Sequence, residues 1–268
     1  MPVPPKHAVI LAAGLGSRLR PLTASTPKPL IPVHGVPILY NTLAALADVG
    51  VQTATVVVGY RKEAIRRACG SRFGRIDVHY VESPIFDRTG SAYSLWLARE
   101  ALLAGDALVL EGDVFFETEV LNRLVGWKPG DVAAVSPFDR TMTGSAVTIS
   151  TRGMVDQVLM DQTVAGPGRG EPLFKTLNLF RFTQGTLRRA VVPALDEVIR
   201  SGAITTYVEQ VLAALIRAQA LRLVAADCGD LKWFEIDSAE DLRTAEAIFT
   251  PCSAPADAKR RVGHLSSA

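Results

Sequence analysis

Glycine, arginine and lysine gather in the segment Leu11–Leu30, which directly follows the apolar run HAVI. The backbone N–H groups of Gly14–Ser17 can cradle an anion, Arg18 stands beside them, and Lys28 lies between two prolines that restrict its backbone. The segment is not a dinucleotide fingerprint, because Leu19 stands where the fingerprint has glycine. It is not a P-loop either, because it lacks Gly-Lys-Ser/Thr. A monophosphate would not need so long a cradle. The pattern therefore favours a nucleoside triphosphate site over a tight turn with surface arginines.

Two aspartates end apolar runs farther along the chain. Asp113 follows ALVLEG, and Asp237 follows WFEI. A carboxylate in such a place either caps a helix or turn, or binds a metal ion. Mg²⁺ uses few protein carboxylates together with phosphate oxygens and water. If the two aspartates converge, they form a Mg²⁺ site beside the triphosphate.

Short apolar runs alternate with amphipathic segments in the first half of the chain, which is typical of βαβ units. The segments expected to form strands are 7–13, 53–60, 76–83 and 106–116. The segments expected to form helices are 37–50, 62–73 and 91–103. This order predicts an α/β fold, with a Rossmann-like, mostly parallel sheet and helices on both faces. Ligands of such sheets bind beyond the carboxyl ends of the strands, where Ala12–Arg18, Gly59 and Gly112 fall.

The pattern changes near Asp131, where shorter strands follow one another and a mixed extension of the sheet is expected. We predict a helix that begins after a Ser238 cap and closes the fold. No internal repeat or linker divides the chain. The sequence predicts one domain over residues 7–250 and a disordered tail over 251–268.

The composition excludes several classes of function. The chain has 268 residues and a formal net charge of +2, which is too small to indicate a nucleic acid partner. Three cysteines without metal-ligand spacing indicate reduced thiols. No apolar stretch predicts a signal peptide or a membrane span. We therefore expect a cytoplasmic protein, and the sequence leaves its oligomeric state open, a homodimer included.

The segment LAAGLGSRLRPLTASTPKPLIPVHGVPIL resembles the signature of the sugar-phosphate nucleotidylyltransferase superfamily. Members of this superfamily transfer a nucleoside monophosphate from a nucleoside triphosphate to a phosphorylated acceptor. Further matches at VVVGY, EGDVF and FEIDSAEDL extend the resemblance over residues 8–249. The resemblance implies a nucleotidyltransferase fold and an enzyme that depends on Mg²⁺.

The resemblance also implies roles for single residues. The base and sugar of the nucleotide would contact Ala12, Ala13 and Gly14. Its β- and γ-phosphates would contact Gly16, Ser17 and Arg18. Lys28 would neutralise charge at the α-phosphate, and Asp113 and Asp237 would hold Mg²⁺. The remaining residues that we expect to bind nucleotide are Gly59, Glu82, Ser91 and Gly112, although Glu82 also fits a turn carboxylate.

Two segments point to a narrower group. YSLWLARE, which starts at Tyr93, resembles a helix of the small cytidylyltransferases that act on phosphocholine and phosphonates. FKTLNLFRF resembles a strand of phosphonate-pathway cytidylyltransferases, in which Lys175 and Asn178 would line the acceptor pocket. Tyr93 and Glu209 are further candidates for acceptor binding, and a Trp233/Glu209 pair would suit a quaternary amine.

These patterns predict CMP transfer from CTP to a small phosphonate, similar to 2-aminoethylphosphonate or phosphonoformate, or to phosphocholine, with release of pyrophosphate. One departure affects the choice of base. Cytidylyltransferases of this group carry two asparagines where this chain has Gly90 and Ser91. A sugar-1-phosphate nucleotidylyltransferase that uses dTTP, UTP or GTP therefore stays an alternative, as does a non-catalytic nucleotide-binding regulator.

Overall fold

The computed structural model describes residues 4–127, 130–139, 142–163 and 172–250. In these ranges the strands are β1 His7–Ala12, β2 Pro32–Val33, β3 Val36–Pro37, β4 Thr53–Val58, β5 Arg72–Phe73, β6 Ile76–Glu82, β7 Ala107–Glu111, β8 Val114–Phe116, β9 Asp131–Pro137, β10 Thr143–Ile149, β11 Val155–Thr163, β12 Phe174–Phe182, β13 Leu223–Asp227 and β14 Trp233–Glu235.

The α-helices are α1 Ile38–Asp48, α2 Lys62–Cys69, α3 Ser91–Leu97, α4 Arg99–Leu103, α5 Glu119–Gly126, α6 Gln184–Thr186, α7 Val192–Arg200, α8 Val208–Arg217 and α9 Ala239–Ile248. Short helical turns of other types are η1 Ser17–Leu19, η2 Leu22–Ala24, η3 Lys28–Leu30, η4 Phe86–Arg88 and η5 Leu187–Val191.

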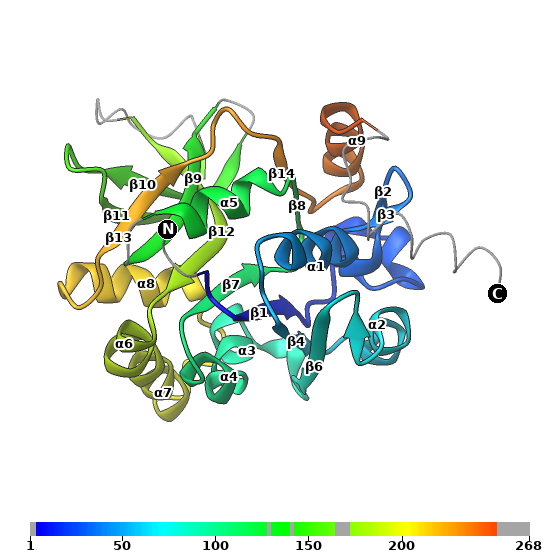
Figure 1. The fold of residues 1–268 in the computed structure, drawn as a ribbon, viewed down its shortest axis with the longest axis horizontal. Coiled ribbons are helices and arrows are strands. Elements are labelled where there is room, and N and C mark those ends of the chain that lie inside the picture. The colour runs from blue at the N-terminus through cyan, green and yellow to red at the C-terminus, as the bar shows by residue number, and fades with distance from the viewer. Residues whose placement is uncertain (1–3, 128–129, 140–141, 164–171, 251–268) are drawn as a thin grey trace.

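One large mixed sheet forms the centre of the molecule (Figure 1). Its strands follow the order β11-β10-β12-β7-β1-β4-β6-β5, and β9 joins β12 to β13. The part formed by β7, β1, β4 and β6 is parallel, as the alternation of strands and helices predicts. Beyond β7 the order turns antiparallel, because β12 runs against β7, β9 and β10.

Helices cover both faces of the sheet, and each face has its own apolar core. The buried strand β1 shows how one segment serves both. Ala8, Ile10 and Ala12 pack into the core under α1 and α2, while Val9 and Leu11 pack into the core under α3, α7 and α8. Strands buried on both sides read as continuous apolar runs. The predicted fold class, an α/β mixed sheet with an extension, is confirmed.

The segment 106–116 differs from the single strand that its apolar run predicts. It divides into β7 and β8, and β8 leaves the large sheet to pair with β14. The division occurs at Gly112, whose N–H donates to the Leu11 carbonyl at 2.9 Å. A Cβ on Gly112 would lie 2.7 Å from that same oxygen, so only glycine lets the chain cross β1 this closely. The turn leaves Asp113 at the edge of the sheet.

A bulge in β12 redirects one side chain. The pairing of β12 with β9 shifts register between Thr176 and Phe180, and Asn178 adopts a left-handed backbone with φ 55°. The Asn178 N–H donates to the Thr176 hydroxyl at 3.2 Å. Bulges re-aim side chains and are frequent beside active sites. Here the bulge directs Asn178 toward Glu111 at the end of β7.

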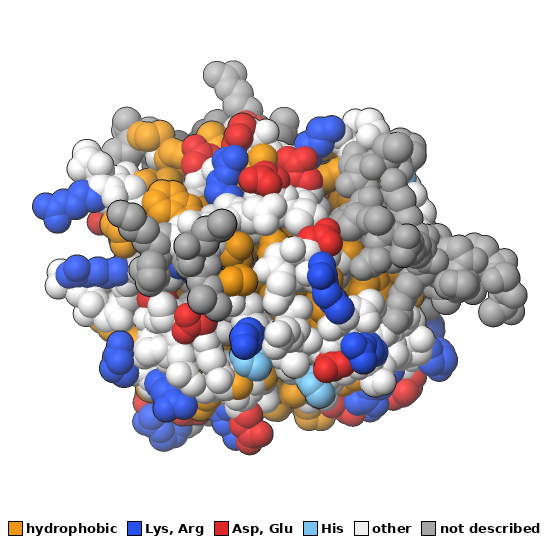
Figure 2. Space-filling view, in the orientation of Figure 1, with side chains coloured by type: hydrophobic (Ala, Val, Ile, Leu, Met, Phe, Trp, Pro, Cys, Tyr) orange, Lys and Arg blue, Asp and Glu red, His pale blue; other side chains and the backbone are white. Residues whose placement is uncertain are grey.

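The surface carries no large field of one sign on the face shown in Figure 2, where acidic and basic side chains alternate. No helix within the described ranges is both long and apolar enough to span a bilayer. The predicted tail, 251–268, lies outside the described residues.

The cap of α9 fixes the segment that carries Asp237. The Ser238 hydroxyl accepts from the Asp241 N–H at 3.2 Å, and the Asp241 carboxylate accepts from the N–H groups of Asp237 and Ser238 at 3.0 and 2.7 Å. We expect Ser238→Ala to lower the free energy of unfolding by about 1 kcal/mol, because it removes this N-cap.

Urea denaturation measures this change. Ser201→Ala, an exposed serine at the end of α7, is the control and is expected to stay within about 0.5 kcal/mol of the parent chain. Equal unfolding midpoints for Ser238→Ala and the parent chain would contradict the role of the cap.

Candidate active site

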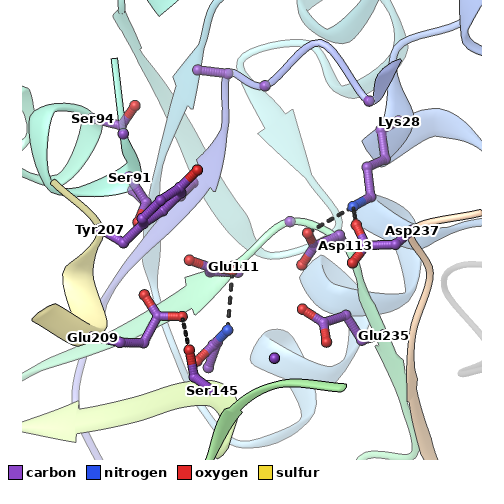
Figure 3. A pocket seen from close by; sticks show the side chains of 18 of the residues that line it. Lys28, Ser91, Ser94, Glu111, Asp113, Ser145, Tyr207, Glu209, Glu235 and Asp237 are labelled. Atoms are coloured by element: carbon purple, nitrogen blue, oxygen red, sulfur yellow. Dashed lines mark hydrogen bonds and ion pairs between the residues drawn. The ribbon is translucent and has the colours of Figure 1, made fainter. Parts of the chain in front are cut away.

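A cavity of about 530 Å³ opens beyond the carboxyl ends of β1 and β7, where the sequence places the glycine loop (Figure 3). The first residues of α3, the turn before α8, and strands β10, β12 and β14 complete its walls. Six carboxylates and three basic side chains line it: Glu111, Asp113, Asp161, Glu209, Glu235 and Asp237, and Arg18, Lys28 and Lys175. The wall is therefore acidic overall, although it includes the predicted phosphate loop.

The glycine loop is shaped by Gly16, which adopts a left-handed backbone with φ 60° before the turn η1. A Cβ at this position would lie 2.9 Å from Lys28 Cβ, so a side chain would also displace Lys28. The Thr23 hydroxyl donates to the Gly16 carbonyl at 2.8 Å and holds the loop. A left-handed residue followed by a right-handed turn is the conformation of an anion-binding nest.

Lys28 joins three parts of the chain. Its ammonium lies 2.8 Å from Asp113 Oδ2 and 2.6 Å from Asp237 Oδ1, and the Arg18 guanidinium lies 2.9 Å from Asp237 Oδ2. Burial alone would lower the pKa of Lys28, but the two carboxylates raise it above its usual value. Burial would raise the pKa of Asp237, but Lys28 and then Arg18 lower it, and the pKa is below its usual value. Lys28 and Asp237 are therefore both charged at neutral pH.

Three carboxylates cluster beside this network. Glu111, Asp113 and Glu235 each place one oxygen within 4.8 Å of the others. Lys175 pairs with Glu235 at 2.9 Å, and Asn178 Nδ2 donates to Glu111 at 3.2 Å. Burial, followed by the charge of Glu209, raises the pKa of Glu111 well above its usual value. Burial also raises the pKa of Glu235, although Lys175 opposes the shift.

The opposite wall is built on the first turn of α8. Glu209 is 7% exposed, and its Oε1 accepts from the Ser145 hydroxyl at 3.3 Å. The Ser91 hydroxyl accepts from the Val208 N–H at 3.0 Å and so anchors the start of α8. A Cβ on Gly90 would lie 2.2 Å from the Thr206 carbonyl, so glycine is needed for the turn before α8 to pack there. Gly90 and Ser91 thus position Glu209.

Most of the residues expected from the sequence line this one cavity: Ala12, Ala13, Gly14, Gly16, Ser17, Arg18, Lys28, Ser91, Gly112, Asp113, Lys175, Asn178, Glu209 and Asp237. Lys175 is 5% exposed, so it is a buried lysine of the cavity wall and not a surface lysine.

Four candidates lie outside the lining of the cavity. Glu82 forms an ion pair with Lys62, whose hydrogen bond lowers the pKa of Glu82. The Tyr93 ring packs on Trp96, with centroids 5.9 Å apart, and Trp233 pairs with Phe116 in the small sheet. Gly59 lies beneath the loop, where a Cβ would be 2.7 Å from the Ala13 carbonyl. It therefore packs against the site without facing the cavity.

The structure adds residues that the sequence analysis did not select, namely Glu111, Ser145, Tyr207 and Glu235. A signal for two of them exists in the sequence. Glu111 and Asp113 are two residues apart, as are Glu235 and Asp237. Successive side chains of a strand alternate between its faces, so residues two apart share one face. No local signal marks Ser145 or Tyr207.

The comparison with protein families agrees with the predicted resemblance. Residues 7–127 match the family model described as nucleotidyl transferase. CMP-5'-(3-aminopropyl)phosphonate synthase of Streptomyces rubellomurinus is 38% identical over 247 residues, which are 92% of this chain and 39% of that protein. The 2-aminoethylphosphonate cytidylyltransferase of Lancefieldella rimae is 37% identical over 113 residues, or 42% of this chain and 45% of that protein. The chain thus spans less than half the length of these relatives.

Solved structures show the same fold. CTP:phosphocholine cytidylyltransferase from Streptococcus pneumoniae matches with a TM-score of 0.74 and 22% identity, over 92% of this chain and all of that one. The family model confirms the predicted resemblance to nucleotidyltransferases, and the two relatives confirm the predicted resemblance to phosphonate cytidylyltransferases.

The raised pKa of Glu111 predicts how stability depends on pH. Above 4.5, the usual pKa of a glutamate, the folded protein retains a proton that the unfolded chain releases, so this group lowers stability as pH rises through that interval. Glutamine cannot ionise and can still accept from Asn178. We therefore expect the stability of Glu111→Gln relative to the parent chain to increase with pH, by at most about 1.4 kcal/mol per pH unit.

Urea denaturation in EDTA between about pH 5 and about pH 8 measures this difference. Glu197→Gln, an exposed glutamate on α7, is the control for loss of one charge. A difference between Glu111→Gln and the parent chain that does not change with pH would contradict the raised pKa of Glu111.

Proposed function

Because residues 7–127 match the nucleotidyl transferase family and the cavity joins the glycine loop to an acidic wall, we propose that this chain is a cytidylyltransferase. It transfers CMP from CTP to a small phosphonate and releases pyrophosphate. The observation that carries the proposal is Lys28, held by Asp113 and Asp237 beside the glycine loop. The names of the relatives from Streptomyces rubellomurinus and Lancefieldella rimae support a phosphonate acceptor and a cytidine nucleotide.

The residues of the site suit an in-line transfer. An acceptor oxygen attacks the α-phosphorus of CTP, and the bond to the β-phosphate oxygen breaks. A phosphate monoester has a second pKa of about 6. A phosphonate group likewise carries at least one ionised oxygen at neutral pH, so the attacking oxygen needs no general base. The barrier is the repulsion between anions, which Arg18, Lys28 and Lys175 reduce by placing cations along the cavity.

The donor set fits a divalent cation. Asp113 lines the cavity with one buried oxygen, Oδ1, that has no hydrogen-bond partner among the described residues. Asp237 lies against the same ammonium, and hard carboxylate oxygens are the ligands that Mg²⁺ uses. We propose that Asp113 and Asp237 hold Mg²⁺, which would supply charge neutralisation at the phosphates. The acidic excess of the wall is a further reason to expect bound cations there.

The sugar-1-phosphate alternative loses its main support. Its support is that Gly90 and Ser91 replace the two asparagines of the cytidylyltransferases, but the contact with Thr206 explains the glycine through packing. Ser91 is likewise engaged by the Val208 N–H. The cytidylyltransferase hypothesis therefore accounts for this departure without a change of nucleotide.

A pyrophosphate-release matrix tests the proposal. CTP, UTP, dTTP and GTP are each combined with 2-aminoethylphosphonate, phosphonoformate, phosphocholine and glucose 1-phosphate, with Mg²⁺ or with EDTA. We expect CTP and 2-aminoethylphosphonate to give the highest kcat/KM, and EDTA to abolish the release. A sugar phosphate as the best acceptor, or no release with any pair, would refute the proposal.

A matched arginine pair tests the phosphate loop. Arg18 lines the cavity and contacts Asp237, whereas Arg20, two positions on, is exposed and outside the lining. We expect Arg18→Ala to lower kcat/KM for CTP by about tenfold to about a hundredfold, the value of one charge-assisted hydrogen bond. Steady-state kinetics of both variants measure the difference. An equal loss in Arg20→Ala would show that overall charge, and not the position of Arg18, causes the effect.

A further inference from the structure

The acidic wall divides into two parts. Glu111, Asp113 and Glu235 form the three-carboxylate cluster, but Glu209 lies on the other side of the cavity and is not a member of it (Figure 3). Arg18 and Lys28 lie at the opposite end, beside Asp237. Within the described residues no ion pair joins Glu209 to a basic side chain, so the protein itself does not neutralise this charge.

Glu209 is buried with one oxygen left without a partner. The residue is 7% exposed, and its Oε1 accepts from Ser145 while Oε2 has no hydrogen-bond partner in the described chain. An unpaired buried carboxylate oxygen carries a large desolvation cost. Since Glu209 also lines the cavity, that cost indicates a ligand that donates to Oε2.

The neighbours of Glu209 select the kind of cation. The Ser145 hydroxyl, which donates to Glu209, also contacts the Met160 thioether at 3.7 Å, and Met160 and Tyr207 line the same cavity. Neutral and apolar groups around one carboxylate suit a monovalent cation on a short alkyl chain better than Mg²⁺, which prefers several oxygens and water. An ammonium group with N–H donors would satisfy Oε2 directly.

Primary and quaternary amines are bound by different protein groups. A trimethylammonium group has no N–H to donate, and it is bound by cages of aromatic faces. Only Phe86 and Tyr207 are aromatic among the described residues that line the cavity. The wall therefore lacks a cage and offers carboxylate oxygens instead, which favours a primary ammonium over choline. A carboxylate tail, as in phosphonoformate, would be repelled.

We propose that Glu209, with Ser145 and Met160, forms the subsite that binds the primary ammonium of an aminoalkylphosphonate acceptor. This inference rests on the proposed function, which it narrows from small phosphonates to those with a protonated amine. Glu209 is a specificity-determining residue that lies away from the phosphorus undergoing substitution. Its removal should therefore change KM for the acceptor more than kcat.

Three acceptors that differ only in their tail group isolate the contribution of the primary ammonium. 2-Aminoethylphosphonate, n-propylphosphonate and 2-(trimethylammonio)ethylphosphonate share the phosphonate but end in a primary ammonium, a methyl group and a quaternary ammonium. With CTP and the unaltered chain, we expect kcat/KM for the primary amine to exceed each of the others by about tenfold to about a hundredfold. Equal values for the primary amine and n-propylphosphonate would overturn the inference.

Glu209→Gln then tests the residue itself, because glutamine keeps the bond to Ser145 and removes the charge. We expect KM for 2-aminoethylphosphonate to rise by about tenfold or more, and KM for n-propylphosphonate to change by less than about twofold. Glu197→Gln, on the exposed side of α7, is the matched control and should alter neither. Equal rises for both acceptors in Glu209→Gln would indicate a structural role and overturn the inference.

The two proposals fail in different ways. If the chain is not a cytidylyltransferase, none of the three acceptors releases pyrophosphate from CTP, and the narrower inference falls with it. If n-propylphosphonate or the quaternary amine reacts as well as 2-aminoethylphosphonate, CMP transfer stands and only the ammonium subsite is refuted.

Discussion

The contact of Lys28 with Asp113 and Asp237 is the interaction on which the rest of the site depends. It ties the glycine loop, the turn after β7 and the segment before α9, which are distant in sequence, to one ammonium group. Removing one partner of this half-buried network would leave a partly desolvated charge with fewer opposite charges around it, and is therefore destabilising. The loop at Gly16 packs on Lys28, and the cap at Ser238 fixes the segment that carries Asp237, so both features position residues of this contact.

Charge balance explains the remaining architecture. A wall with six carboxylates and three basic side chains would repel a nucleoside triphosphate if it acted alone. Separation of the charges resolves this conflict. Arg18 and Lys28 lie beside the loop, Lys175 pairs with Glu235 in the carboxylate cluster, and Glu209 lies apart from both. Under the proposed function, each substrate brings the charge that its part of the cavity lacks.

Local sequence was sufficient for the parallel half of the sheet and for the loop, because apolar runs, strand ends and a dense motif all lie within short segments. It was not sufficient where distant segments decide the geometry. The pairing of β10 with β12 brings Ser145 to the cavity, and the packing of the turn before α8 on Gly90 brings Tyr207 there. Glu82 resembled a ligand at a strand end, but its partner Lys62 is twenty residues away.

The link from Gly90 and Ser91 to the start of α8 has a consequence for how the cavity can change during evolution. The backbone of α8 is tied to the wall of the cavity through Thr206 and Val208, so shifting the helix would also disturb that wall. Exchange of a side chain on its first turn carries no such penalty. Under the proposed function, the choice of acceptor can therefore change by point substitution on a fixed scaffold, and a library of variants confined to that turn would sample such changes.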